Sequence, residues 1–317
     1  MRYFVTLITA ACLLGIPIKS FALDLFTKIG FETRYSTGDS TYHISFDDTW
    51  ENGGHGESEV EFPLANIMAG VSLTVGSRHE KKANLTKSQF CFTWLEVVTE
   101  GAGTMKDSDW IENDAAFGEA SHPGKDLHTE SDAQLQGTIY DMSYAYRFTF
   151  NNSLTLGPII GFRYQDFEYD VYGYRGIYWT TPVSGENKVL EYKITYRIPY
   201  IGLSSDLLFG RNNQFQLALT FVYSDWAKVD DRDNHVLRYK LLEGDCEGEA
   251  YLIKLNLEWK CYSRWTLSLG AEYVDIETSG RQHQSFYAGP YKGVTYNVHD
   301  KITSSSRSGI FRISYTF

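Results

Sequence analysis

Beyond its first 22 residues the sequence has no long hydrophobic run, and it is poor in cysteine, proline and methionine. It contains 4 Cys, 7 Pro and 4 Met among 317 residues. Without a stretch of about 20 apolar residues, a helix cannot cross a membrane. The cysteines beyond residue 22 are Cys91, Cys246 and Cys261. Their odd number excludes a framework in which every cysteine is paired, but it leaves one bridge open.

Positive charge is also scarce. The chain carries 29 Lys and Arg against 40 Asp and Glu, which gives a formal net charge of −11. Proteins that bind nucleic acid neutralise phosphates with clustered Lys and Arg, so this balance argues against a nucleic-acid partner. An acidic exposed surface would instead attract basic peptides.

The amino terminus has the features of a secretory signal peptide. Arg2 supplies the positive charge, residues 4–18 are mostly apolar, and small residues precede a cleavage site after Ala22. We therefore predict that residues 1–22 are a signal peptide and that residues 23–317 form a single domain. An uncleaved anchor is the alternative, but the apolar run is short and is broken by a glycine and a proline.

The carboxy terminus reads as a strand that ends on an aromatic residue. Phe311, Ile313, Tyr315 and Phe317 share one face of this strand, and polar side chains share the other. Such an ending resembles the final strand of bacterial outer-membrane barrels, in which a terminal Phe is usual.

Alternation with a period of two recurs along the chain, as in residues 215–223, 253–259 and 265–273. Aromatic residues make up 15% of the sequence, with 23 Tyr and 19 Phe, which suits the girdles of a membrane barrel. Charges on the inward face, such as Lys254 and Glu258, would be costly in the core of a soluble β-sandwich, the alternative fold. In a wet barrel lumen they are ordinary.

We therefore predict an all-β fold, a ten-stranded antiparallel transmembrane β-barrel with long extracellular loops. An even strand count lets both termini face the periplasm. The predicted strands lie near residues 24–44, 58–75, 87–102, 131–150, 153–173, 187–209, 213–229, 237–260, 264–280 and 303–317.

The connections sort into two kinds. Short turns follow every second strand, except for a long, basic turn predicted at 76–86. The predicted extracellular loops are 45–57, 103–130, 174–186, 230–236 and 281–302.

Two clusters on the predicted outer side carry candidate chemistry. Asp107 and Asp109 are two residues apart, so on an extended segment both carboxylates point the same way and repel each other. Asp231, Asp233 and His235 share one face in the same manner, and a carboxylate beside an imidazole can orient a general base. Four strands separate the clusters in a ring of ten, so we expect them to face each other across the mouth. Solvated acidic loops or Ca²⁺ ligands are the alternatives.

The chain resembles the omptins, which are outer-membrane endopeptidases built on a ten-stranded barrel. The order and approximate spacing of the shared stretches hold along nearly the whole chain after the signal peptide. These stretches are Ser20-Phe21-Ala22, Met105-x-Asp107-x-Asp109-Trp110, Ser121-His122-Pro123, Tyr192-Lys193, Pro199-Tyr200-Ile201-Gly202-Leu203, Tyr223-Ser224-x-Trp226, Asp231-x-Asp233-x-His235 and Tyr315-Thr316-Phe317.

The resemblance implies a role for each residue of the two clusters. Asp107 and His235 would activate the attacking water, Asp109 would support Asp107, and Asp233 would orient His235. Asp231 would help to bind a basic substrate side chain before the scissile bond through charge-assisted hydrogen bonds. The implied partners are polypeptide substrates and outer-membrane lipid, the implied location is the outer membrane with the active site facing the exterior, and no metal is implied.

Two departures from the omptin pattern affect the substrate and the lipid. Omptins place a second acid for the basic side chain near the top of the first strand, where this chain has Tyr42, with Asp39 nearby. We therefore expect a weaker, broadened preference for Arg or Lys. Omptins also hold lipopolysaccharide through a Tyr-x-Glu-x-Arg stretch. The counterpart at residues 164–168 puts Glu168 in place of the Arg, so we expect dependence on this lipid to be altered or lost.

Other readings of the barrel remain open. It could retain the site yet work as an adhesin or receptor, in which case the Asp107→Ala variant would still bind surfaces. A passive pore is disfavoured because ten strands leave little lumen once side chains fill it. We expect a monomer.

Overall fold

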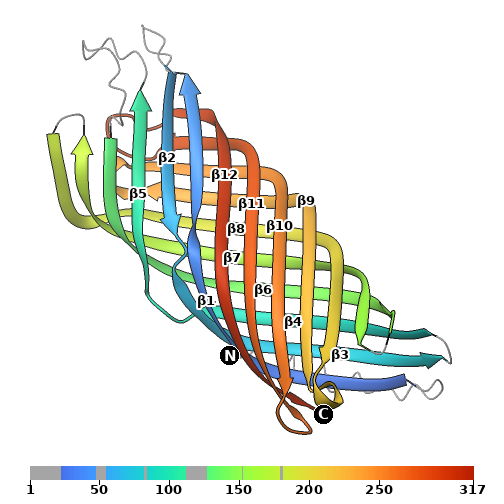
Figure 1. The fold of residues 1–317 in the computed structure, drawn as a ribbon. Helices are drawn as coiled ribbons and strands as arrows, with labels where there is room; N and C mark the ends of the chain where they lie inside the picture. Colours follow the sequence, from blue (N-terminus) through green and yellow to red (C-terminus); the bar gives the residue numbers. More distant parts are fainter. Residues whose placement is uncertain (1–22, 48–54, 82–83, 112–126, 152, 179–180) are drawn as a thin grey trace, which may run out of the picture.

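The computed structural model describes residues 23–47, 55–81, 84–111, 127–151, 153–178 and 181–317, and these form one antiparallel sheet (Figure 1). The strands are β1 (Leu23–Asp47), β2 (His55–Pro63), β3 (Asn66–Lys81), β4 (Asn84–Val97), β5 (Gly101–Ile111), β6 (Leu127–Thr149), β7 (Leu154–Tyr178), β8 (Thr181–Phe209), β9 (Phe215–His235), β10 (Lys240–Lys260), β11 (Trp265–Phe286) and β12 (Thr295–Thr316). Two single-turn 3-10 helices, η1 (Arg211–Asn213) and η2 (Val236–Arg238), follow β8 and β9.

The sheet closes into a barrel because β12 pairs with β1, in a register that runs from Lys28↔Thr316 to Ser45↔His299. Two of the ten barrel strands are interrupted. β2 and β3 are the halves of the second strand, and β4 and β5 are the halves of the third. Both breaks stay within the ladder, since the Leu64 N–H donates to the Gly38 carbonyl and the Leu135 N–H to the Glu100 carbonyl, each at 2.9 Å. The prediction of a ten-stranded antiparallel barrel is confirmed.

Several predicted strands end too early on the loop side. β5 continues through residues assigned to the loop 103–130, and β9 and β11 run to His235 and Phe286. The long turn predicted at 76–86 is wrong, because β3 and β4 pair out to Lys81↔Asn84. The charged side chains there indicated a loop, but both faces of a strand can be polar once it leaves the lipid. The predicted signal peptide lies outside the described residues.

The outer face of the barrel divides into an apolar and a charged zone. Near the turns, side chains such as Leu219, Phe221 and Leu255 are exposed, as lipid-facing residues must be. Further along β9 the outward residues are Lys228 and Arg232, which pair with glutamates of β10. The membrane zone therefore ends below this level, and the loop-side end of the barrel stands clear of the lipid. Among the described residues, no helix is long and apolar enough to cross a membrane.

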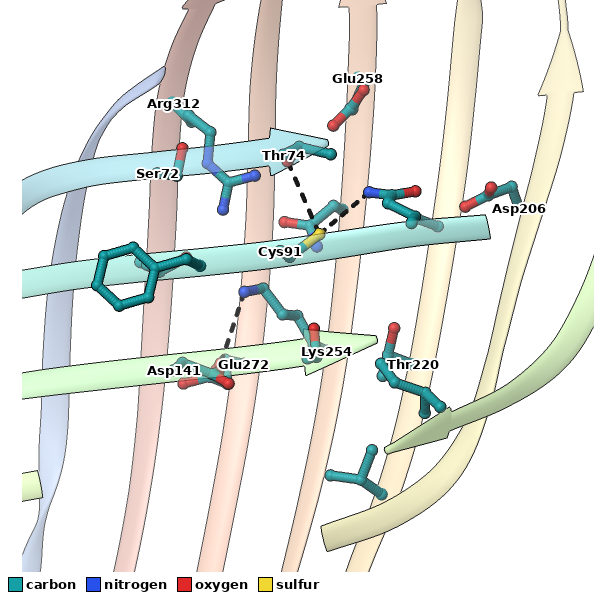
Figure 2. A pocket seen from close by; sticks show the side chains of 18 of the residues that line it. Ser72, Thr74, Cys91, Asp141, Asp206, Thr220, Lys254, Glu258, Glu272 and Arg312 are labelled. Atoms are coloured by element: carbon teal, nitrogen blue, oxygen red, sulfur yellow. Dashed lines mark hydrogen bonds and ion pairs between the residues drawn. The ribbon is translucent and has the colours of Figure 1, made fainter. Parts of the chain in front are cut away.

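The lumen is filled by charged side chains that neutralise one another. Glu272 of β11 holds both Arg34 of β1 and Arg163 of β7, the latter at 2.9 Å, and all three are almost fully buried. Arg312 and Arg34 both bind Glu32 of β1. Figure 2 shows Glu272 beside Lys254. Both line a cavity of about 130 Å³ among these polar residues. The lumen is thus a cross-linked polar core.

Replacing Glu272 tests this core. The Glu272→Gln variant leaves two buried guanidinium groups without their shared carboxylate, which should lower the free energy of unfolding by about 3–5 kcal/mol. The matched control is Glu277→Gln, on the same strand as Glu272. It removes the exposed ion-pair partner of Lys301 and should lower the free energy of unfolding by less than about 1 kcal/mol. Unfolding would be followed as the loss of the fast-migrating, unboiled band on a denaturing gel. Equal effects of the two variants would contradict the account of the lumen.

Candidate functional site

A β-bulge in β9 turns the second acidic cluster into the barrel. Below the bulge, even-numbered residues such as Val222 and Ser224 face the lumen. Between Ser224 and Ala227 the strand holds one residue more than β10, and it holds one residue more than β8 at the same level. Asp225 and Trp226 are consequently both exposed, and the Trp226 N–H donates to the Ser224 hydroxyl at 3.2 Å. Beyond the bulge the odd-numbered residues face inward.

The inward turn brings Asp233 and His235 into contact. The His235 Nε2 lies 2.9 Å from the Asp233 Oδ2, and Asp233 is completely buried. The same oxygen accepts a hydrogen bond of 2.5 Å from the hydroxyl of Tyr42, which reaches across from β1. The carboxylate of Asp233 is therefore held from two sides, and it fixes the imidazole at the end of β9.

The first cluster lies on the opposite side of the mouth. Tyr42, Val60 and Asp107 are successive partners in one row across β1, β2 and β5, and Asp109 follows two residues on. Partial burial, together with the like charge of Asp109, raises the pKa of Asp107 to about 6. The charges of Arg238 and His235 oppose this shift. The two clusters thus lie close enough to act on each other electrostatically.

Two cationic residues near the clusters were not predicted from the sequence. Arg238 ends η2, three residues after His235, and the charges of Asp107 and Asp109 outweigh its partial desolvation and raise its pKa. Lys240 begins β10, and desolvation together with Arg238 lowers its pKa to about 8. Both residues follow the Asp-x-Asp-x-His motif closely, so their position along the chain was the available signal.

Asp231 lies one step deeper in the lumen than Asp233. It is 5% exposed, and no side chain of the described residues donates a hydrogen bond to either carboxylate oxygen. Burial and the charges of Asp300 and Asp233 raise its pKa well above the ordinary value, an effect that the Gly244 amide only partly offsets. Asp300, on β12, was not among the sequence candidates.

Aromatic rings form the floor beneath the clusters. The rings of Phe62 and Tyr192 stack with their centroids 4.0 Å apart, and Tyr42 and Tyr169 pack around them. All four side chains are buried. Their bulk fills part of the lumen at the level of the clusters, since Tyr192 pairs with Asp233 in the ladder between β8 and β9.

The remaining sequence candidates are placed as follows. In the described part of the chain no group of three or more His, Cys, Asp or Glu is arranged to hold a metal ion. The three cysteines beyond residue 22 are all free thiols. The stretch Ser121-His122-Pro123 lies outside the described residues. Asp166 and Glu168 point outward from β7, and Lys193 of β8 binds both, Asp166 at 3.1 Å.

Comparisons with known proteins point to one family. The model of the Omptin family matches residues 81–284. The chain is 25% identical over 164 residues to the plasminogen activator of Yersinia pestis, covering 50% of this chain and 49% of that protein. It is 24% identical over 163 residues to the outer membrane protease OmpP of Escherichia coli, covering 46% and 49%. The chain thus spans about half the length of the curated relatives it matches.

A solved structure supports the fold over nearly the full length. The crystal structure of the outer membrane protease OmpT from Escherichia coli superposes with a TM-score of 0.71 at 14% sequence identity. The match covers 94% of this chain and 99% of that one. At this identity the likeness establishes the barrel fold.

The bulge predicts an exchange of accessible positions on β9. In a cysteine-free background, Arg232→Cys should react with a membrane-impermeant maleimide and Asp233→Cys should not, because residue 233 is buried. Deleting Asp225 removes the extra residue and should reverse the two reactivities, since a one-residue slip exchanges the faces of a strand. Unchanged labelling after the deletion, in a barrel that still shows the heat-dependent gel shift, would contradict this role of the bulge.

Proposed function

Because the chain belongs to the omptin family, we propose that it is an endopeptidase of the outer membrane that cleaves polypeptides at the exterior mouth of the barrel. The observation that carries this proposal is the fixed Asp233–His235 pair, which faces Asp107 across the mouth. The charged outer face at the same level puts this mouth beyond the lipid, where polypeptides have access.

The reaction we propose uses water as the nucleophile. Asp233 binds His235 through Nε2, so Nδ1 is the ring nitrogen that takes the proton. A water held between Nδ1 and the Asp107 carboxylate loses that proton as its oxygen attacks the scissile carbonyl. The imidazolium, stabilised by Asp233, then gives the proton to the leaving amine. No covalent acyl-enzyme forms.

Supporting residues fix the geometry of this step. Tyr42 donates to the same Asp233 oxygen that binds His235, so it is a positioning residue for the general base. This hydrogen bond gives Tyr42 a role in holding Asp233, instead of the contact with substrate that its place in the sequence suggested. Asp109 keeps a second negative charge beside Asp107. Asp231, two residues deeper than Asp233 on the same face, is the carboxylate for a basic substrate side chain.

Lipopolysaccharide fits this chain poorly at the position the family uses. The outward residues there are acidic, and Lys193 and the Thr195 hydroxyl already occupy Asp166. An acidic pair repels the lipid phosphates. We therefore propose that dependence on this lipid is altered or lost, and the mechanism contains no step that requires it.

Alanine substitution tests the four proposed catalytic positions. Asp107→Ala, Asp109→Ala, Asp233→Ala and His235→Ala should each lower peptide cleavage by ~10²-fold or more, as expected for the loss of general-base function. The matched control is Asp230→Ala. This outward residue of β9 pairs with Arg197 and should leave cleavage nearly unchanged. Near-normal activity of His235→Ala would remove the assignment of the base. Retained surface binding without cleavage by the unaltered protein would favour an adhesin.

The raised pKa of Asp107 predicts the acid limb of the pH profile. Because this carboxyl has a pKa of about 6, kcat/KM should fall as the pH drops through 6 and Asp107 takes up a proton. Arg238→Gln removes a cation that favours the carboxylate, so the limb should move to higher pH by roughly 0.5–1 unit. Arg232→Gln, an exposed change on the outer face, should leave the limb in place. A limb that moves to lower pH in Arg238→Gln would contradict the assignment.

A further inference from the structure

Buried carboxylates in this barrel are neutralised by cations, with a marked exception at the mouth. Glu272 and Glu32 each hold two guanidinium groups, Glu258 binds Lys28 at 2.9 Å, and Asp206 binds Lys87 at 2.9 Å. Asp231 and Asp300 are buried as well, yet among the described residues neither takes part in an ion pair. An unpaired buried carboxylate is costly, so it either takes up a proton or binds a cation that arrives from outside.

Asp231 and Asp300 come together over a strand position that has no side chain. A Cβ added to Gly244 of β10 would lie 2.0 Å from the Asp231 Oδ1 and 2.9 Å from the Asp300 Oδ2. Two carboxylates from β9 and β12 therefore approach the same point from different sides. Gly244 leaves the space for them, because any larger residue would collide with both.

The hydrogen bonds around this pair leave most of its capacity unused. The Oδ1 of Asp300 and both oxygens of Asp231 lack a side-chain partner among the described residues. The Oδ2 of Asp300 accepts from the Cys246 thiol, at 3.7 Å, and a thiol is a weak donor. Burial raises the pKa of Asp300 to about 7. A guanidinium or ammonium group would supply the missing donors and the missing charge together.

The position of Asp300 matches the acid that the first strand lacks. In the ladder between β1 and β12, Asp300 pairs with Ile44, which is two residues from Tyr42 and faces inward with it. Asp300 thus enters the lumen beside Tyr42, from the neighbouring strand. Asp231 is slightly exposed and Asp300 is not, so a cation entering from the mouth meets Asp231 first.

Resting on the proposed endopeptidase function, we infer that Asp300 is a specificity-determining residue, which with Asp231 forms a two-carboxylate pocket for an Arg or Lys side chain of the substrate. Two residues along a strand span about 6.6 Å. The pocket therefore lies below the Asp233–His235 pair by about the length of an extended Arg or Lys side chain. With this pocket, the preference for basic residues is stronger than the broadened preference expected from Tyr42 alone.

Matched peptides test the pocket. One peptide carries Arg before the scissile bond, and the other carries citrulline, which has the same shape without the charge. Asp300→Asn should lower kcat/KM for the Arg peptide about ten- to a hundredfold, as expected for one lost charge-assisted contact. Citrulline turnover should change less than about threefold, which also shows that the variant is folded. Glu277→Gln, an exposed change on the adjoining strand, should alter neither.

A double-mutant cycle and a second variant make the test independent of Asp300 alone. If both carboxylates bind one cation, the losses in Asp231→Asn and Asp300→Asn should not add in the double variant. Gly244→Ala closes the space between them and should also lower the ratio of Arg to citrulline turnover. This second variant decides the question if Asp300→Asn does not fold.

The possible outcomes separate this inference from the proposed function. Equal losses for both peptides in Asp300→Asn would make Asp300 structural and overturn the pocket. An unchanged Arg-to-citrulline ratio in Asp300→Asn, or in Gly244→Ala where only that variant folds, would do the same. Failure of the unaltered protein to cleave either peptide, or full activity in Asp107→Ala, would instead overturn the endopeptidase function.

Discussion

Closure of the sheet through the pairing of β1 with β12 is the constraint on which the rest of this structure depends. Once the ring is closed, about half of the residues on each strand face a narrow lumen enclosed by only ten strands. Charges there must be matched by charges from other strands, as Arg34 and Arg163 are by Glu272. These cross-links tie opposite walls together and hold rigid the mouth on which Asp107 and His235 stand.

Alternation of apolar and polar residues was enough to predict the barrel. It was not enough to predict that Asp231, Asp233 and His235 face the lumen. Residues 215–223 place odd-numbered apolar side chains in lipid, and Asp231, Asp233 and His235 are odd-numbered as well. Strict alternation would therefore turn the cluster outward. The bulge at residues 225–226 reverses the parity, and the only local sign of it is the break in the pattern after Tyr223. A one-residue insertion is invisible to periodicity because the sequence on each side remains a good strand.

The strand count and the closing strand could be predicted from sequence because lipid imposes a clean apolar face. The strand ends could not be predicted, since β5 and β9 continue where both faces are polar and resemble a loop. The site, too, could be predicted only in part. Asp-x-Asp spacing gives local geometry directly, whereas the contact between Tyr42 and Asp233 crosses the lumen and depends on closure. Asp300 meets Asp231 only through the empty position at Gly244.

In a closed barrel, a side chain that is missing from one strand can be replaced by a side chain from the neighbouring strand. Inward side chains of neighbouring strands occupy the same region of the lumen, so a pocket is defined by position on the inner wall. β1 and β12 are adjacent only because the ring closes, and Asp300 on β12 reaches the region that Tyr42 leaves uncharged on β1. Tyr42 is then free to hold Asp233. The departure at Tyr42 is thus compatible with a charged pocket, because the wall that carries the charge is continuous across the seam.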